Sequence, residues 1–154
     1  MKLEIFTDGA CLGNHGPAGI GVVIRHNGAV IKEISKPIGQ ATNNIAEYTA
    51  LIYALQEALI LKAEEVLAKA DSQLMCEQIA GTYAVRQAHI KPLFEQVKRL
   101  AMGFKRFRLE HVPREKNAEA DRLSRKAVKN GKQSDQDGRP AAAGSGEESP
   151  SSKG

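Results

Sequence analysis

Apolar and polar residues alternate in three segments near the start of the chain, at 2–8, 18–26 and 28–38. Strict alternation is typical of strands with one buried face. The Asn27-Gly28 pair between the last two segments indicates a tight hairpin, because both residues accept positive φ. The pattern therefore predicts three strands that form an antiparallel meander.

Beyond residue 40, apolar residues recur every three or four positions, as in amphipathic helices. Helices are predicted over 42–63, 72–81, 93–104 and 117–131, and strands over 64–71 and 106–113. Thr42, Asn43 or Asn44 can cap the first helix. Strand–helix–strand crossovers join parallel strands, so the fourth and fifth strands should run parallel to the first. The predicted fold class is α/β, a five-stranded mixed sheet with helices on both faces.

The end of the chain differs in composition from the rest. From Gly131, the expected stop of the last helix, Gly, Ser and Pro dominate and large apolar residues are absent. We therefore expect one folded domain over 1–130 and a disordered tail over 131–154. The formal net charge of +4 is compatible with a phosphate-rich partner. With no apolar run of membrane-spanning length and only two cysteines, the chain is expected to be a cytoplasmic monomer that does not bind membranes.

Aspartate is scarce in the first 134 residues, where it occurs only at Asp8, Asp71 and Asp121. Asp8 and Asp71 are expected to close the first and fourth strands. If these strands are parallel neighbours, their carboxyl ends meet at one edge of the sheet, where ligands bind in such folds. Glu47 and Asp121 are expected in the first turns of two helices. All four carboxylates could therefore converge.

Four carboxylates in a small volume repel one another, and cations relieve that repulsion. Oxygen ligands without Cys or His favour Mg²⁺ or Mn²⁺, and two such ions together promote phosphoryl transfer. Each acid also has a structural explanation. Asp8 could belong to a turn, Glu47 to a capping box with Asn44, Asp71 to a helix cap, and Asp121 to a favourable interaction with the helix dipole.

Four segments resemble, in order, the motifs of the type 1 ribonuclease H family, and together they cover residues 1–130. They are FTDGACLGNHGPAGIGVVI, TNNIAEYTAL, ADSQL and NAEADRLSRKA. The resemblance implies the α/β ribonuclease H-like fold. It further implies an endonuclease that hydrolyses the RNA strand of RNA–DNA hybrids and leaves 5′-phosphate and 3′-hydroxyl ends. It also implies a two-metal-ion mechanism with Mg²⁺ or Mn²⁺. The catalytic, metal-binding residues that it implies are Asp8, Glu47, Asp71 and Asp121.

The same resemblance implies which residues contact the hybrid. The amides of Asn14, Asn43, Asn44 and Gln73 match family residues that line the minor groove, where an amide can test for the ribose 2′-hydroxyl. Glycines such as Gly9 are expected to let the backbone come close to the nucleic acid.

This chain departs from the family pattern in two places. Many members carry a histidine on the loop before the last aspartate, but here Arg114 occupies that loop and His111 falls on the fifth predicted strand. We expect Arg114 rather than His111 to be the auxiliary residue; it would stabilise charge, because a guanidinium does not shuttle protons. The chain also lacks the basic, Trp-containing protrusion of some members. It is closest to a histidine-lacking, archaeal-like subgroup of prokaryotic ribonuclease HI.

Other functions remain open from the sequence. One is a catalytically weak or silent hybrid-binding module, although all four acids are present. Another is a related nuclease that also cleaves double-stranded RNA or acts on DNA. A phosphatase with Asp8 as nucleophile is disfavoured, because Ala10 stands where a D-x-D arrangement needs a second acid.

Overall fold

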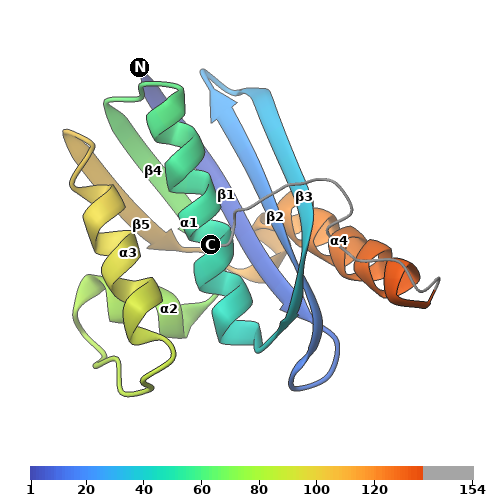
Figure 1. Ribbon diagram of the computed structural model, residues 1–154. Coiled ribbons are helices and arrows are strands. Elements are labelled where there is room, and N and C mark those ends of the chain that lie inside the picture. Colours follow the sequence, from blue (N-terminus) through green and yellow to red (C-terminus); the bar gives the residue numbers. More distant parts are fainter. Residues whose placement is uncertain (137–154) are drawn as a thin grey trace.

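A twisted five-stranded sheet forms the centre of the computed structural model, which describes residues 1–136 (Figure 1). The strands are β1 (Lys2–Cys11), β2 (Gly16–His26), β3 (Ala29–Ala41), β4 (Glu65–Ala70) and β5 (Arg106–His111). The helices are α1 (Asn43–Ile60), α2 (Gln73–Ala80), α3 (Lys91–Ala101) and α4 (Ala118–Gln136), with a short 3-10 turn, η1 (Arg114–Lys116), before α4.

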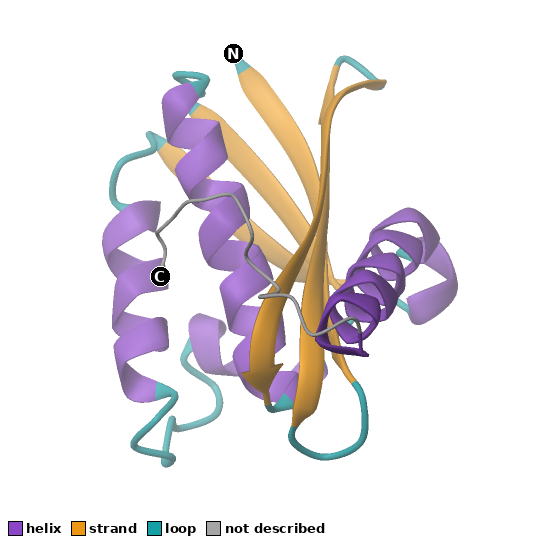
Figure 2. Ribbon diagram, turned by 45° about the vertical axis from the view of Figure 1, so that its right-hand side comes forward, coloured by secondary structure: helices purple, strands orange, loops and turns teal. Residues whose placement is uncertain are grey.

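The strand order is β3-β2-β1-β4-β5, so β1 lies at the centre of the sheet. β1, β2 and β3 pair antiparallel, whereas β4 runs parallel to β1 and β5 parallel to β4. Figure 2 shows α4 on one face of the sheet and the other three helices on the opposite face. The predicted fold class is thus confirmed. None of the helices within residues 1–136 is both long enough and apolar enough to cross a membrane.

The main core lies between the sheet and α1. Alternate residues of β1 turn toward the helix, including Leu3 and Ile5, and both are fully buried. The helix contributes a stripe at helical spacing that includes Tyr48, Leu51 and Leu55, which are also fully buried. This packing fixes α1 against the centre of the sheet and so fixes where its first residues lie.

Of the element ends that differ from the prediction, two belong to the elements that carry Asp8 and Asp121. β1 does not end at Asp8, because Gly9–Cys11 continue to pair with β2 after the parallel pairing with β4 stops at Thr7. α4 does not stop at Gly131 but continues to Gln136, since a single glycine inside a helix costs only about 1 kcal/mol. The remainder of the predicted tail, 137–154, lies outside the described residues.

The glycines of β2 allow α4 to lie directly on the sheet. A Cβ on Gly21 would come within 2.1 Å of the Ala120 carbonyl oxygen and 2.7 Å of the Ser124 nitrogen. A Cβ on Gly19 would come within 2.5 Å of the Ala127 Cβ. No side chain fits between this strand and this helix, so the position of α4 depends on both glycines.

We predict that Gly21→Ala lowers the free energy of unfolding by about 1–3 kcal/mol, because the added methyl group meets backbone atoms that cannot rotate away. Urea unfolding measures the change. Glu33→Ala, an exposed change on β3, is the control and should stay within about 0.5 kcal/mol of the parent. Equal stability of Gly21→Ala and the parent would contradict the close approach of α4.

Candidate active site

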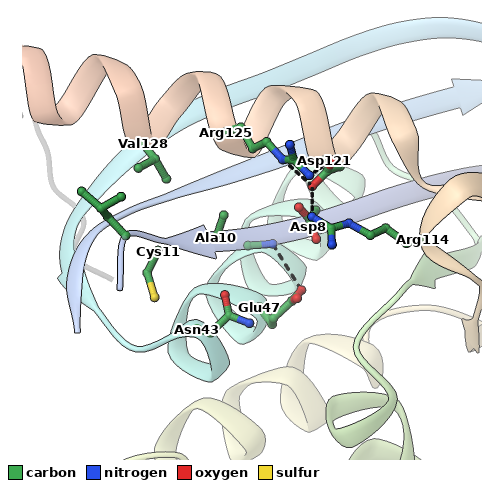
Figure 3. Close-up of a pocket in the computed structure, with 11 residues that line it drawn as sticks. Asp8, Ala10, Cys11, Asn43, Glu47, Arg114, Asp121, Arg125 and Val128 are labelled. Atoms are coloured by element: carbon green, nitrogen blue, oxygen red, sulfur yellow. Dashed lines mark hydrogen bonds and ion pairs between the residues drawn. The ribbon is translucent and has the colours of Figure 1, made fainter. Parts of the chain in front are cut away.

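The predicted acids meet where β1 runs past the end of β4, beside the beginnings of α1 and α4 (Figure 3). Asp8, Glu47 and Asp71 each offer a carboxylate oxygen, and these oxygens lie within 4.8 Å of one another. Asp121 is not part of that trio but lines the same cavity as Asp8 and Glu47. The structure therefore brings all four together as a cluster of three with a fourth beside it.

An open cavity of about 400 Å³ gives access to this cluster. Its polar lining comes from β1, α1, η1 and α4, and includes Asn43, Arg114 and Arg125 beside the acids. Asp8 lies inside β1 rather than at its end, yet it comes directly after Thr7, the last residue of β1 that pairs with β4. This register explains why Asp8 still lies near Asp71.

Glu47 is held by the backbone of β1. The Gly9 N–H donates to Glu47 Oε1 at 3.2 Å. A Cβ on Gly9 would lie 2.2 Å from the Ala46 carbonyl carbon, so this position must be glycine for α1 to approach. The prediction that Gly9 makes room for nucleic acid is therefore wrong, because the backbone of α1 fills the space beside its Cα atom. Glu47 also falls just beyond the first turn of α1, not within it as predicted.

Asp8 is held from the opposite face of the sheet. The Ser124 hydroxyl of α4 donates to Asp8 Oδ2 at 2.6 Å, and both side chains are buried. Asp8 accordingly does not serve a turn, the structural explanation that the sequence left open.

Asp71 is tied to both β1 and α4 through Asn117. The Asn117 amide donates to the Thr7 carbonyl at 2.9 Å and to Asp71 Oδ2 at 3.4 Å. The cap of α2 is Ser72, whose hydroxyl accepts from the Met75 N–H, so Asp71 is not needed as a cap.

Thr42 caps α1 and leaves the neighbouring asparagines free of that role. Its hydroxyl accepts from the Ile45 N–H at 3.2 Å. Asn43 is exposed and lines the cavity, whereas the Asn44 side-chain oxygen is buried without a hydrogen-bond partner within the described structure. Neither Asn44 nor Glu47 forms the capping box that was considered.

Asp121 is flanked by two arginines. Arg125, one turn further along α4, approaches it at 3.0 Å, and Arg114 approaches it at 3.8 Å (Figure 3). Both guanidinium groups also line the cavity. The Asp121 side of the site therefore carries positive charge, whereas the three-acid cluster depends on neutral donors.

Burial and mutual repulsion raise the pKa values of two of the acids. Burial, with smaller contributions from Asp71 and Asp121, raises the pKa of Asp8 to about 7, although the Ser124 hydrogen bond opposes the shift. Burial, followed by Asp8 and Asp71, raises the pKa of Glu47 well above its usual value. The cluster is thus short of positive charge. Its all-oxygen donor set fits a hard divalent cation.

The remaining predicted residues lie at different distances from the cavity. Arg114 lines the cavity, whereas His111 is exposed at the end of β5, the strand on which it was predicted. Asn14 is exposed in the loop between β1 and β2, and Gln73 is the exposed first residue of α2. Their contacts with a substrate stay predictions.

The sequence pattern did not single out Ser124, Arg125 or Asn117 as site residues. The signal for the first two was present, because residues three and four positions after Asp121 share its helix face. Asn117 gave no such signal, since its partners Thr7 and Asp71 come from distant parts of the chain.

Comparison with known proteins agrees with this geometry. The family described as "Reverse transcriptase-like" matches residues 6–127. The RNase H1 structure from the archaeon Halobacterium salinarum NRC-1 superposes with a TM-score of 0.81 at 35% identity, over 84% of this chain and 98% of that one. LC11-RNase H1, solved in complex with an RNA/DNA hybrid, gives a TM-score of 0.78 at 40% identity, over 82% and 96%. This chain belongs to the type 1 ribonuclease H family.

The similarity to longer ribonuclease H proteins covers only part of their length. The chain is 42% identical over 130 residues to the bifunctional protein Rv2228c of Mycobacterium tuberculosis, covering 83% of this chain but 36% of that protein. It is 35% identical over 128 residues to ribonuclease HI of Halobacterium salinarum, covering 82% of this chain and 64% of that protein. The chain therefore spans between about a third and two thirds of the length of these curated relatives.

We predict that Asp8→Asn stabilises the metal-free ribonuclease H domain by about 1–3 kcal/mol near pH 8. The raised pKa means that folded Asp8 binds more protons than unfolded Asp8 between about pH 4 and pH 7. Parent stability should therefore fall as pH rises through that window, and the variant should show a smaller fall. Chemical unfolding in EDTA tests this, with the exposed Glu33→Gln as control. A less stable Asp8→Asn would contradict the mutual repulsion.

Proposed function

We propose that this ribonuclease H is an endonuclease that hydrolyses the RNA strand of RNA–DNA hybrids with Mg²⁺ or Mn²⁺ as cofactor, leaving 5′-phosphate and 3′-hydroxyl ends. The convergence of Asp8, Glu47 and Asp71 within 4.8 Å is the observation that carries the proposal. The solved complex of LC11-RNase H1 with an RNA/DNA hybrid supports the same substrate class for this chain.

In this mechanism the four acids form the catalytic centre. Asp8, Glu47 and Asp71 would bind one divalent cation, and Asp8 with Asp121 would hold a second. Such ions supply the positive charge that activates an attacking water and stabilises the leaving oxygen. The protein fixes the three clustered carboxylates beforehand, because Gly9 donates to Glu47, Ser124 to Asp8 and Asn117 to Asp71. Pre-orientation of this kind avoids reorganisation during the reaction.

Arg114 is the proposed auxiliary residue. It lies 3.8 Å from Asp121 and lines the cavity, so its guanidinium can reach a phosphate bound there. A guanidinium cannot serve as a proton donor, so its role is to position the phosphate and stabilise charge.

Recognition of the hybrid is assigned to Asn14, Asn43, Asn44 and Gln73. Asn43 lines the cavity, and the unpartnered buried oxygen of Asn44 supports a role other than capping. Amides both donate and accept, which suits them to a ribose 2′-hydroxyl. Double-stranded RNA offers the same hydroxyl and is therefore a second candidate substrate.

The location and the oligomeric state are also proposals. Cys11 and Cys76 are free thiols, which is consistent with a reducing compartment such as the cytoplasm. We also propose a monomer, because one copy of the chain supplies all four acids of the site.

We predict that the protein cleaves labelled RNA–DNA hybrid when Mg²⁺ or Mn²⁺ is present and not when EDTA replaces the ion. Asp71→Asn and Glu47→Gln should each reduce kcat by at least about 100-fold, because both remove a charged oxygen ligand. Glu33→Gln should leave kcat unchanged. Double-stranded RNA and DNA duplex are assayed in parallel. No cleavage of hybrid with either ion would reject the enzyme and leave a binding module.

We predict that Arg114→Ala lowers kcat/KM by about 10- to 100-fold, because the guanidinium no longer reaches the phosphate. Arg114→Lys should recover part of the loss, since it keeps the charge but not the bidentate geometry. His111→Ala is the matched comparison and should change kcat/KM less than about threefold. A larger effect of His111→Ala than of Arg114→Ala would reverse the assignment.

A further inference from the structure

One buried hydroxyl contacts both halves of the site. Ser124 Oγ lies 2.6 Å from Asp8 Oδ2 and 2.9 Å from the Asp121 backbone carbonyl oxygen, and Ser124 has no exposed surface. Ser124 therefore links the strand that carries Asp8 to the helix turn that carries Asp121.

The Ser124 hydroxyl has a single proton for these two acceptors. A carboxylate oxygen is the stronger acceptor, and carbonyls inside a helix already accept from the N–H four residues later. The proton is therefore directed at Asp8. With Oδ2 fixed in this way, the Asp8 carboxyl group cannot rotate freely about its χ2 bond, and one orientation toward Glu47 and Asp71 is selected.

The sheet is built so that Ser124 can reach Asp8. Asp8 pairs with Gly21 across β1 and β2, and the place where Gly21 would carry a Cβ lies 2.7 Å from the Ser124 nitrogen. Any larger residue at Gly21 would move α4 away from the sheet and lengthen the Ser124–Asp8 contact. The glycine and the serine thus act together on the same carboxylate.

Among the three clustered acids, Asp8 accepts the shortest hydrogen bond, 2.6 Å from Ser124. Gly9 donates to Glu47 at 3.2 Å and Asn117 donates to Asp71 at 3.4 Å. Only the Ser124 bond comes from the helix on which Asp121 is located, three residues before it. This bond therefore sets the spacing between the three-acid cluster and the fourth acid.

We infer that Ser124 is a positioning residue that orients Asp8 toward the cation and fixes the separation of Asp8 from Asp121. The inference rests on the proposed function for the presence of a divalent cation. Ser124 touches neither substrate nor cation in this role, and it acts only through Asp8. Loss of its hydroxyl should therefore weaken cation binding before any substrate is present.

The test is a Mn²⁺ titration of the substrate-free domain, with unbound Mn²⁺ followed by electron paramagnetic resonance. Ser124→Ala should weaken Mn²⁺ binding by about 10-fold, as is usual when a hydrogen-bond partner of a metal ligand is removed. Ser35→Ala is the matched control, because Ser35 also donates to the α4 backbone, at Leu123, but does not contact an acid. It should bind Mn²⁺ as the parent does.

Steady-state kinetics provide a second measurement. For Ser124→Ala the Mn²⁺ concentration needed for half-maximal kcat should rise, whereas the KM for the hybrid should stay within about twofold of the parent. If Ser124→Ala does not fold, Ser124→Cys is measured in its place. The cysteine keeps only a weak hydrogen-bond donor, so this variant should also bind Mn²⁺ more weakly than the parent does.

The outcomes separate this inference from the proposed function. Parent-like Mn²⁺ affinity of a folded Ser124 variant overturns the inference and leaves the proposed function intact. Equal losses in Ser124→Ala and Ser35→Ala overturn it as well, since they indicate a general effect of loosening α4. A parent that binds no Mn²⁺ and cleaves no hybrid overturns both.

Discussion

The buried carboxyl groups of Asp8 and Glu47 repel each other and Asp71, and the surrounding structure holds them in place against that repulsion. Only 4% of Asp8 and 5% of Glu47 is exposed, and burial raises the pKa of both. Each clustered acid accepts one neutral hydrogen bond, which orients it without neutralising it. Neutral donors do not cancel the repulsion among the carboxylates. A divalent cation bound between them would cancel it and would stabilise the folded chain.

Close backbone packing is what brings acids from three different elements to one place. Gly9 lets α1 lie against β1 from one face, and Gly21 lets α4 lie against β2 from the other. Glu47 then lies close to Asp8 from α1, and Ser124 donates to Asp8 from α4. Gly9, Gly19 and Gly21 therefore serve to bring helices close to strands, and the convergence of the acids is a consequence of that packing.

The site is electrostatically uneven. Neutral donors surround Asp8, Glu47 and Asp71, whereas Arg114 and Arg125 lie beside Asp121. The negative side suits a cation and the positive side suits a phosphate, so a phosphodiester bound across the cavity would contact both. Under the proposed function, Arg114 stabilises charge at this position and does not transfer a proton, because a guanidinium stays protonated.

The sequence alone determined the order of strands and helices along the chain, the mixed sheet and the four acids expected to converge. Alternation, helical periodicity and the short motifs around the acids can all be read from neighbouring residues. The sequence could not show that β1 continues past Asp8 or that α4 passes through Gly131, since both depend on pairing and packing with β2 and β3. It also could not show that Ser124 donates to Asp8, that Asn117 donates to Asp71, or what Gly9 contacts. Their partners are distant in the chain, and only tertiary packing decides which donor meets which carboxylate.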